Sequence, residues 1–401
     1  MMFTNKLRER IRWTGWKETA IRWSVLVLYL LMTVQFVGCY LFLSHPYIDL
    51  ERFGRGYERL PFQTRLLLAP LFRWAQNSPF LVHYASRLSR NGYFFPHGIG
   101  PCGVVQLWLD VPCVLVAGWA TVQIYRAASR RHLLGWLVYP LFLVLCTVTY
   151  LLHAVQNFRF IYDMPSLMFF ALGLYLIYFR KPVTLLVALF AVATWNRETT
   201  LLLIPFFLLS ACVRGRAAPE RRAPGAPNEA ARGGGLVSVI REAPGAVSFR
   251  WKRALRPEVA LPAVLMVAYW AAWHLFVFHL FRHNSSEYYP RLAFNWQCVR
   301  RLRYYPQLFS AGGYLLPVVL LFRRRVYDAQ VRVWLWMIPC WYAVMAVWGI
   351  LVETRVFGEL LPLIACAATM IAEETLAAAM QKRELDGLAE DEDHARLAKA
   401  A

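Results

Sequence analysis

Long apolar runs recur throughout this chain of 401 residues. A helix needs roughly 20 apolar residues to cross the roughly 30 Å hydrocarbon layer of a membrane, so runs of this length limit the possible folds more than any other feature. The pattern predicts an all-α, polytopic transmembrane helix bundle with about ten spans. The longer runs cover residues 24–44, 103–125, 133–153, 161–179, 259–281 and 331–351, and the shorter or interrupted runs cover residues 183–195, 199–213, 309–322 and 358–376.

Composition favours a membrane location. Hydrophobic residues make up 58% of the chain and charged residues only 17%, which is too little polar surface for a soluble domain. The net charge of +20 would indicate nucleic-acid binding in a soluble protein, but most lysines and arginines here stand in short runs between apolar segments. We therefore expect membrane lipids as partners and no nucleic acid. The eight cysteines are scattered without metal-ligand spacing, and we predict neither a metal site nor a cofactor.

The basic residues also predict the orientation of the chain. Short loops rich in lysine and arginine stay in the cytoplasm, and the basic segments here alternate with the other loops as about ten crossings require. The basic N-terminus precedes an apolar run long enough to span, so we predict an uncleaved first helix and a cytoplasmic N-terminus. The predicted cytoplasmic segments are the N-terminus, the tail and residues 126–131, 180–181, 214–257 and 323–325.

One long loop divides the chain. Residues 214–257 are rich in Ala, Gly, Pro and Arg and are predicted to form a flexible cytoplasmic linker. The predicted order is a basic N-terminus (1–23), a front transmembrane part (24–213) with an outer loop (45–102), the linker, a rear transmembrane part (258–376) and a tail (377–401).

The string Asn196-Arg197-Glu198 interrupts the apolar sequence between residues 183 and 213. One continuous helix would carry an Arg–Glu pair through lipid at a cost of about 2.5–3.5 kcal/mol per charge. Two short helices that meet at the outer face are therefore favoured.

The predicted outer loop 45–102 holds polar residues of catalytic type. Asp49, Glu58 and Arg65 precede an amphipathic stretch that extends to about residue 85 and is typical of a helix lying in the membrane interface. A loop of this length needs charges for solubility, which is one interpretation. Long loops without a domain of their own are often functional, which is the other.

Three further polar strings lie at predicted outer helix ends. Each has a structural interpretation: Asp163 capping a helix, Arg197 and Glu198 both paired within a structural polar network, and Glu359 favoured by a helix dipole. Each also fits a site, with Asp163 as an active-site carboxylate or the partner of a nearby arginine, and Arg197 on a phosphate. With the polar residues of loop 45–102, four strings on one side predict a shared cavity. The three further strings hold Arg159 and Asp163; Asn196, Arg197, Glu198 and Thr199; and Glu353, Arg355 and Glu359.

The outer loop 282–308 breaks the charge pattern, because it carries five arginines among tyrosines and prolines. It is either a tolerated translocated loop or a surface for a phosphate-bearing ligand or anionic headgroups. Arginines near the acyl boundary suit the phosphate of a lipid-linked substrate, and a neighbouring carboxylate suits a general base. Together these groups indicate glycosyl transfer from a lipid-phosphate sugar.

The pattern resembles the GT-C superfamily of polytopic membrane glycosyltransferases, which includes mannosyltransferase-like and lipid-A-sugar-transferase-like enzymes, and bacterial membrane proteins related to it. The resemblance covers residues 20–376 without the linker. It rests on the basic N-terminus, the long acidic first outer loop with its interfacial helix, and the short spans with polar outer ends. It implies a polyprenyl-phosphate sugar donor and a base among Asp49, Glu51 and Glu58, of which Glu58 is favoured for its closeness to the string Leu60–Arg65.

The leading hypothesis is a glycosyltransferase of the bacterial inner membrane that acts at the periplasmic face on a cell-envelope acceptor. Its predicted catalytic carboxylates are Glu58, Asp163 and Asp49. Two alternatives remain: a transporter or flippase of lipid-linked or anionic solutes, for which Asp110 is the candidate mid-membrane group, and a non-catalytic subunit of an envelope-assembly complex. The sugar, the acceptor and the oligomeric state stay open. The predicted substrate-binding residues are Arg65, Arg159, Asn196, Arg197, Glu198, Glu353 and Arg355.

Overall fold

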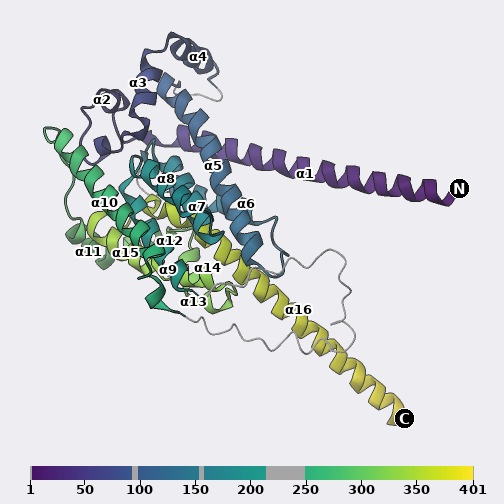
Figure 1. The fold of residues 1–401 in the computed structure, drawn as a ribbon. Coiled ribbons are helices and arrows are strands. Elements are labelled where there is room, and N and C mark those ends of the chain that lie inside the picture. The colour runs from purple at the N-terminus through teal and green to yellow at the C-terminus, as the bar shows by residue number, and fades with distance from the viewer. Residues whose placement is uncertain (1, 93–97, 153–157, 214–248, 401) are drawn as a thin grey trace.

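The computed structural model describes residues 2–92, 98–152, 158–213 and 249–400, which form a bundle of helices with almost no sheet (Figure 1). The predicted all-helical fold is confirmed. Most of the predicted linker, residues 214–248, lies outside the described residues. The elements before residue 214 are α1 (Met2–Leu43), β1 (His45–Pro46), α2 (Leu50–Arg55), α3 (Ala69–Asn77), α4 (Pro79–Ser89), α5 (Pro101–Ala128), α6 (Val138–Leu151), β2 (Phe158–Arg159), α7 (Asp163–Tyr178), α8 (Val183–Thr194) and α9 (Leu203–Cys212).

The described C-terminal part is also helical. Two 3-10 turns matter for the site, Glu198–Leu202 before α9 and Thr354–Leu360 before α16. The helices are α10 (Pro257–Leu280), α11 (Leu292–Arg300), α12 (Tyr305–Ser310), α13 (Leu315–Leu321), α14 (Ala329–Trp334), α15 (Met337–Trp348) and α16 (Leu361–Ala400).

In the part of the chain that the structure describes, five segments are long and apolar enough to cross a membrane: Thr19–Leu43, Pro101–Ala128, Pro257–Leu280, Ala329–Trp348 and Thr354–Arg383. Each overlaps a predicted span. Shorter apolar helices occupy the other runs before residue 214, and two separate helices, α8 and α9, flank residues 195–197. The two-helix interpretation of that segment is therefore confirmed. The total of about ten crossings stays a prediction.

The helices share one hydrophobic core. It joins α1, α5, α6, α7 and α9 to α13–α16, so the segments before and after the linker pack together. Close approach is possible where a residue is small: a Cβ at Gly118 of α5 would lie 2.2 Å from the ring of Tyr139 on α6. By contrast, α10 presents a row of exposed apolar side chains, with Leu275 74% and Val264 62% exposed. An apolar face of this kind suits contact with lipid.

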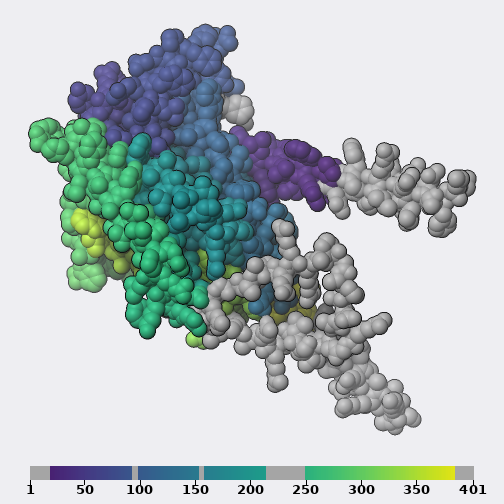
Figure 2. Space-filling view, viewed as in Figure 1, coloured from purple at the N-terminus to yellow at the C-terminus, as the bar shows by residue number. Residues whose placement is uncertain are grey.

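The first loop forms a small unit of its own. Helices α2, α3 and α4 lie at one end of the bundle, over the N-terminal turns of α5 (Figures 1 and 2). Its core includes Phe53, Phe72 and Leu81, and it continues into Phe160–Tyr162 before α7. We call this end of the molecule the loop end.

Two backbone pairings join the first loop to distant segments. The two-residue strands β1 and β2 are parallel, with His45 opposite Phe158. Leu60 pairs with the segment after α10, because its N–H donates to the Ser285 carbonyl at 2.8 Å and its carbonyl accepts from the Glu287 N–H at 2.8 Å. These pairings place residues 45–65, 158–163 and 285–291 beside one another.

Candidate functional site

A cavity of about 370 Å³ lies at the loop end of the bundle. Its walls come from segments far apart in the chain, all of which meet through the pairings described above or at helix ends. The lining comes from Tyr47 and from residues 61–65, 160–163, 197–202, 287–291 and 344–356, together with Trp270 of α10.

Three buried charged side chains meet at the innermost part of the site. Arg197 Nη1 lies 3.5 Å from Asp163 Oδ1 and 3.2 Å from Glu359 Oε1. The Tyr40 hydroxyl donates to Asp163 Oδ2 at 2.8 Å, and the Thr199 hydroxyl donates to Glu359 Oε1 at 2.7 Å. We call Asp163, Arg197 and Glu359 the buried triad. With one arginine and two carboxylates, its formal net charge is minus one.

Local backbone structure explains how these residues meet. Asp163 is the first residue of α7, and Arg197 has an extended backbone (φ −162°, ψ 145°) between α8 and the following 3-10 turn. Glu359 lies in the turn before α16. The Asp163 carboxylate accepts from a tyrosine of α1 and does not cap its own helix. The capping interpretation of Asp163 was therefore wrong, and its role as the partner of a nearby arginine is confirmed.

A second ion pair lies next to the triad. Arg65 Nη2 is 3.0 Å from Glu198 Oε2, and Arg65 Nε donates to both carboxylate oxygens at 3.2 and 3.1 Å. The Arg65 guanidinium also lies over the ring of Tyr162, 4.0 Å from its centroid. The Arg197 guanidinium is 5.7 Å from the same centroid, so both cations lie close to the Tyr162 ring.

Arg355 is held in a third polar group. Its Nη2 donates to Glu353 Oε2 at 2.6 Å and its Nη1 donates to the Phe158 carbonyl at 3.1 Å. The guanidinium stacks over Phe160 at 3.8 Å. Arg355 is buried, whereas Glu353 keeps 33% of its side chain exposed.

The mouth of the cavity carries Glu287, Arg291 and exposed aromatic rings. Glu287 pairs with Arg59 at 2.5 Å and accepts from the Tyr47 hydroxyl at 3.3 Å. Arg291 stacks on Tyr289 at 3.7 Å, and among the described residues no carboxylate lies within 4.0 Å of it. Its guanidinium donates to the Tyr289 hydroxyl and, at 3.5 Å, to the Glu287 carbonyl, which are both neutral acceptors. Among the described arginines that line the cavity, Arg291 is thus the one whose charge no carboxylate neutralises.

Aromatic rings form much of the remaining wall. Tyr288 and Trp348 stack with their centroids 5.3 Å apart, and each is about half exposed. The Trp270 indole N–H donates to the Glu198 carbonyl at 3.0 Å, which fixes that ring against the second ion pair. Flat apolar faces beside charged groups suit a ligand that is polar on its edge and apolar on its face.

Burial and charge shift the pKa of several groups here. Burial alone would lower the pKa of Arg197, but Glu359 and Asp163 outweigh it and hold that pKa above the usual range. Burial, together with the nearby charge of Glu287, raises the pKa of Tyr47. The Tyr47 phenol therefore stays neutral at physiological pH and can donate its hydrogen bond to Glu287.

The structure places the predicted residues in two groups. Asp163, Arg65, Arg197, Glu198, Glu353 and Arg355 line the cavity. The others lie outside its lining. Asp49 caps α2 at an exposed position, Arg159 donates to the carbonyls of Leu41 and Ser44, and Asn196 donates to Ser166 Oγ at 2.8 Å and to the Tyr162 carbonyl at 3.2 Å.

Glu58, the favoured base, also lies outside the cavity lining. Its Oε2 accepts from the Asp49 N–H at 3.0 Å and its Oε1 from the Arg59 N–H at 3.1 Å, with Arg59 Nε 3.4 Å away. The side chain is buried, and both oxygens hold the loop backbone. This geometry gives Glu58 a structural role in the first loop.

Sequence reasoning missed Glu287, Trp270 and Trp348. It did indicate the loop 282–308, which holds Arg291, as a surface for a phosphate-bearing ligand or anionic headgroups, but it did not include Arg291 among the predicted site residues. Glu287 had no signal of its own, because its position depends on the pairing of Leu60 with Ser286, which no local pattern reveals.

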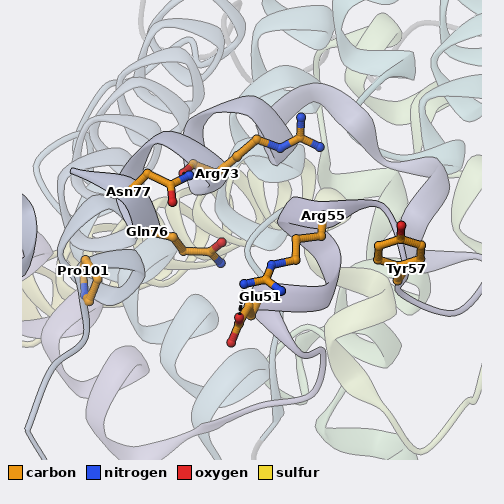
Figure 3. Close-up of a pocket in the computed structure, with 7 residues that line it drawn as sticks. All are labelled: Glu51, Arg55, Tyr57, Arg73, Gln76, Asn77 and Pro101. Carbon is orange, nitrogen blue, oxygen red and sulfur yellow. Dashed lines mark hydrogen bonds and ion pairs between the residues drawn. The ribbon is translucent and has the colours of Figure 1, made fainter.

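A second hollow at the loop end is less suited to chemistry. Glu51, Arg55, Arg73, Gln76 and neighbouring side chains line it (Figure 3). Arg55 pairs with Glu51 at 2.6 Å, Arg73 donates to the Gly54 carbonyl at 2.7 Å, and Gln76 donates to the Leu50 carbonyl at 2.7 Å. The hydrogen bonds of Arg73 and Gln76 hold α2 against α3, while the Arg55–Glu51 pair lies within α2.

Together, the fold and the cavity define an all-helical chain with membrane-length apolar helices and a polar, aromatic-walled site at one end. Comparison with models of known protein families, with curated proteins and with solved structures found no match to this chain. Function must therefore be inferred from the site itself.

Proposed function

We propose that the protein is a membrane glycosyltransferase that moves a sugar from a polyprenyl-phosphate donor to a cell-envelope acceptor. The observation that carries the proposal is the content of the cavity: Arg65, Arg197, Arg291 and Arg355 line one space with the Asp163 carboxylate and several aromatic rings. Guanidinium groups match phosphate oxygens, and aromatic faces suit the apolar faces of a sugar ring or a prenyl chain.

Different arginines would have different tasks. Arg291, which has no carboxylate partner among the described residues, would contact the donor phosphate first. Arg355 would add a second cation, because its partner Glu353 is partly exposed and can be solvated when the phosphate enters. The buried triad holds Arg197 on two carboxylates, so that arginine would fix Asp163 in position.

The proposed reaction is a single displacement. An acceptor hydroxyl oxygen attacks the anomeric carbon of the donor sugar and forms the new glycosidic bond, while the bond from that carbon to the phosphate oxygen breaks. Asp163 takes the hydroxyl proton, and polyprenyl phosphate leaves with the electron pair. Arginines on the phosphate stabilise the charge that develops on the leaving group.

Asp110 gives the transporter alternative little support. A transporter would need this carboxylate of α5 at a substrate pathway. The side chain is 1% exposed and lies outside the cavity lining.

We further propose that the chain lies in a bacterial inner membrane with about ten crossings, the N-terminus in the cytoplasm and the loop end in the periplasm. The amphipathic helices α3 and α4 support this placement, because they expose Trp74, Phe80 and Val82 as an interfacial helix would. The basic turn Arg323–Arg325 would then lie on the opposite, cytoplasmic side.

Cysteine labelling tests this topology. In a Cys340→Ser background, which removes the exposed native thiol, Tyr57→Cys at the loop end should react with a membrane-impermeant maleimide in intact spheroplasts. Arg324→Cys should react only after lysis. Labelling of position 57 only after lysis would refute the periplasmic site.

The function itself is tested with purified full-length protein and a radiolabelled polyprenyl-phosphate sugar, in the presence of cell-envelope extract as acceptor. We expect sugar release or transfer by the native protein. Arg291→Ala should weaken donor binding by about tenfold or more, since a hydrogen-bonded ion pair with phosphate contributes about 1.5–3 kcal/mol. The measured quantity is KM for the donor.

Arg282→Ala is the matched control, because Arg282 belongs to the same basic loop but lies outside the cavity lining. It should leave KM unchanged. The proposal fails if the native protein neither binds nor turns over any polyprenyl-phosphate sugar, or if both variants behave alike.

A further inference from the structure

A separate cavity of about 400 Å³ lies at the other end of the bundle. Helix α7 starts in the candidate site and ends at this cavity, where α8 starts. The C-terminal end of α9 and the N-terminal end of α10 also contribute to it. The lining comes from residues 176–186, 207–211 and 253–259. None of these residues takes part in the proposed reaction.

The lining carries an excess of positive charge. Arg256 lies 3.5 Å from Glu258, and both side chains are largely exposed. For Arg180, Lys181 and Arg253, no carboxylate lies within 4.0 Å among the described residues. Four cations and one carboxylate leave three positive charges without compensation. These three cations thus lie together without a partner in the part of the chain that the structure describes.

The rest of the cavity is apolar. Ile177 and Leu186 are buried, and Phe207, Ala211 and Val259 complete the wall. The lining hydroxyl of Ser210 is already engaged, since it accepts from the Trp334 indole N–H at 2.7 Å and from Gln330 Nε2 at 3.2 Å and donates to the Phe206 carbonyl at 2.7 Å. The cavity therefore offers cations at its exposed side and hydrocarbon at its wall.

The position of Arg253 is fixed by the backbone. The Arg250 N–H donates to the Cys212 carbonyl at 2.9 Å, and Val213 forms an antiparallel bridge with Phe249. This contact holds residues 249–256 against the end of α9. In the same segment Trp251 is 60% and Leu255 66% exposed, between Lys252, Arg253 and Arg256. Exposed aromatic and aliphatic side chains that alternate with cations are typical of the membrane interface.

We infer that this cavity binds the anionic phosphodiester headgroup of a phospholipid, with Arg180, Lys181 and Arg253 on the phosphate and the acyl chain along the apolar wall. The inference rests on the membrane topology proposed above, which places this end in the cytoplasmic leaflet, but not on glycosyl transfer. Basic pockets between helices at that leaflet suit acidic lipid headgroups. A free phosphate ion would use the cations but would leave the apolar wall without a ligand.

A binding experiment tests the inference on the full-length protein in neutral detergent. Short-chain phosphatidylglycerol, short-chain phosphatidylcholine and inorganic phosphate are titrated separately, and bound lipid is counted by native mass spectrometry beside the midpoint of thermal unfolding. The test variant is Arg180→Gln/Lys181→Gln/Arg253→Gln. The matched control is Arg324→Gln/Lys382→Gln/Arg383→Gln, which removes the same charge from residues outside the cavity.

Phosphatidylglycerol should bind the native protein and the control variant with equal affinity. It should bind the test variant about a hundredfold more weakly, because each lost cation near an anionic lipid reduces the affinity about fivefold and the three losses multiply. A second variant, Ala211→Trp, keeps every cation but fills the apolar wall, and it should also lose the tight binding. Since no sugar transfer is measured, the result is independent of the proposed reaction.

Three outcomes would overturn the inference. The first is that a folded cavity variant, either the triple Gln variant or Ala211→Trp, binds phosphatidylglycerol as tightly as the native protein does. Another is equally tight binding of phosphatidylcholine, which would show that charge is not recognised. The third is the same stabilisation by inorganic phosphate, which would make the cavity a site for a free anion.

Discussion

Arg197→Ala is expected to lower the free energy of unfolding by about 3–5 kcal/mol, the cost of removing one partner from a buried ion pair. Arg197 is the one cation within 4.0 Å of both Asp163 and Glu359 among the described residues. Both carboxylates are 1% exposed, so without the guanidinium two negative charges would face each other away from water. Unfolding in mixtures of mild detergent and sodium dodecyl sulfate measures the effect.

The control is an exposed ion pair of the same residue types. Arg55 and Glu51 lie 2.6 Å apart but are 66% and 64% exposed, so Arg55→Ala should change the unfolding free energy by less than about 1 kcal/mol. Adding Asp163→Asn and Glu359→Gln to Arg197→Ala should recover part of the loss by removing the stranded charges. If Arg197→Ala were no more destabilising than Arg55→Ala, the triad would not be the electrostatic centre of the site.

The helical fold was predictable because hydropathy acts over long segments. Runs such as 103–125 and 259–281 coincide with α5 and α10, with the ends shifted by a few residues. The break at 195–197 was also predictable, since an Arg–Glu pair is costly in hydrocarbon and helices end where it occurs. Helix α16 extends far past the predicted span, to Ala400, because its Ala- and Glu-rich tail favours a helix whether or not it crosses a membrane.

The site was predictable only in part. Asp163, Arg197 and Arg355 could be found because ionisable residues at apolar helix ends are rare and need partners. The partners of Arg65 and Arg197 could not be found, because these pairs join residues far apart in the chain: Arg65 with Glu198, and Arg197 with Glu359.

Glu58 shows the limit of reasoning from sequence proximity. Its position beside the string Leu60–Arg65 gave no information on the direction of its side chain, which points at backbone amides of its own loop. The pairing of Leu60 with Ser286 instead brings Arg59 into contact with Glu287, which lines the mouth of the cavity.

Asp163→Asn is expected to reduce the rate of sugar transfer by about 100- to 10,000-fold, the usual contribution of a general base. The fold should survive, because the amide oxygen can still accept from the Tyr40 hydroxyl and Arg197 keeps Glu359 as its partner. Since Asp163 would act on the acceptor proton and not on the donor phosphate, kcat should fall while KM for the donor stays close to its native value. Single-turnover transfer from a radiolabelled polyprenyl-phosphate sugar measures both quantities.

Asp49→Asn is the matched control for that experiment. Asparagine caps a helix about as well as aspartate, so α2 should be unaffected, and Asp49 lies outside the cavity lining. Its rate of transfer should equal that of the native protein. A folded Asp163→Asn protein with native kcat would exclude Asp163 as the base. Glu198, Glu287 and Glu353 would then be tested next, because they are the other carboxylates that line the cavity in the described part of the chain, and each keeps 21–33% of its side chain exposed.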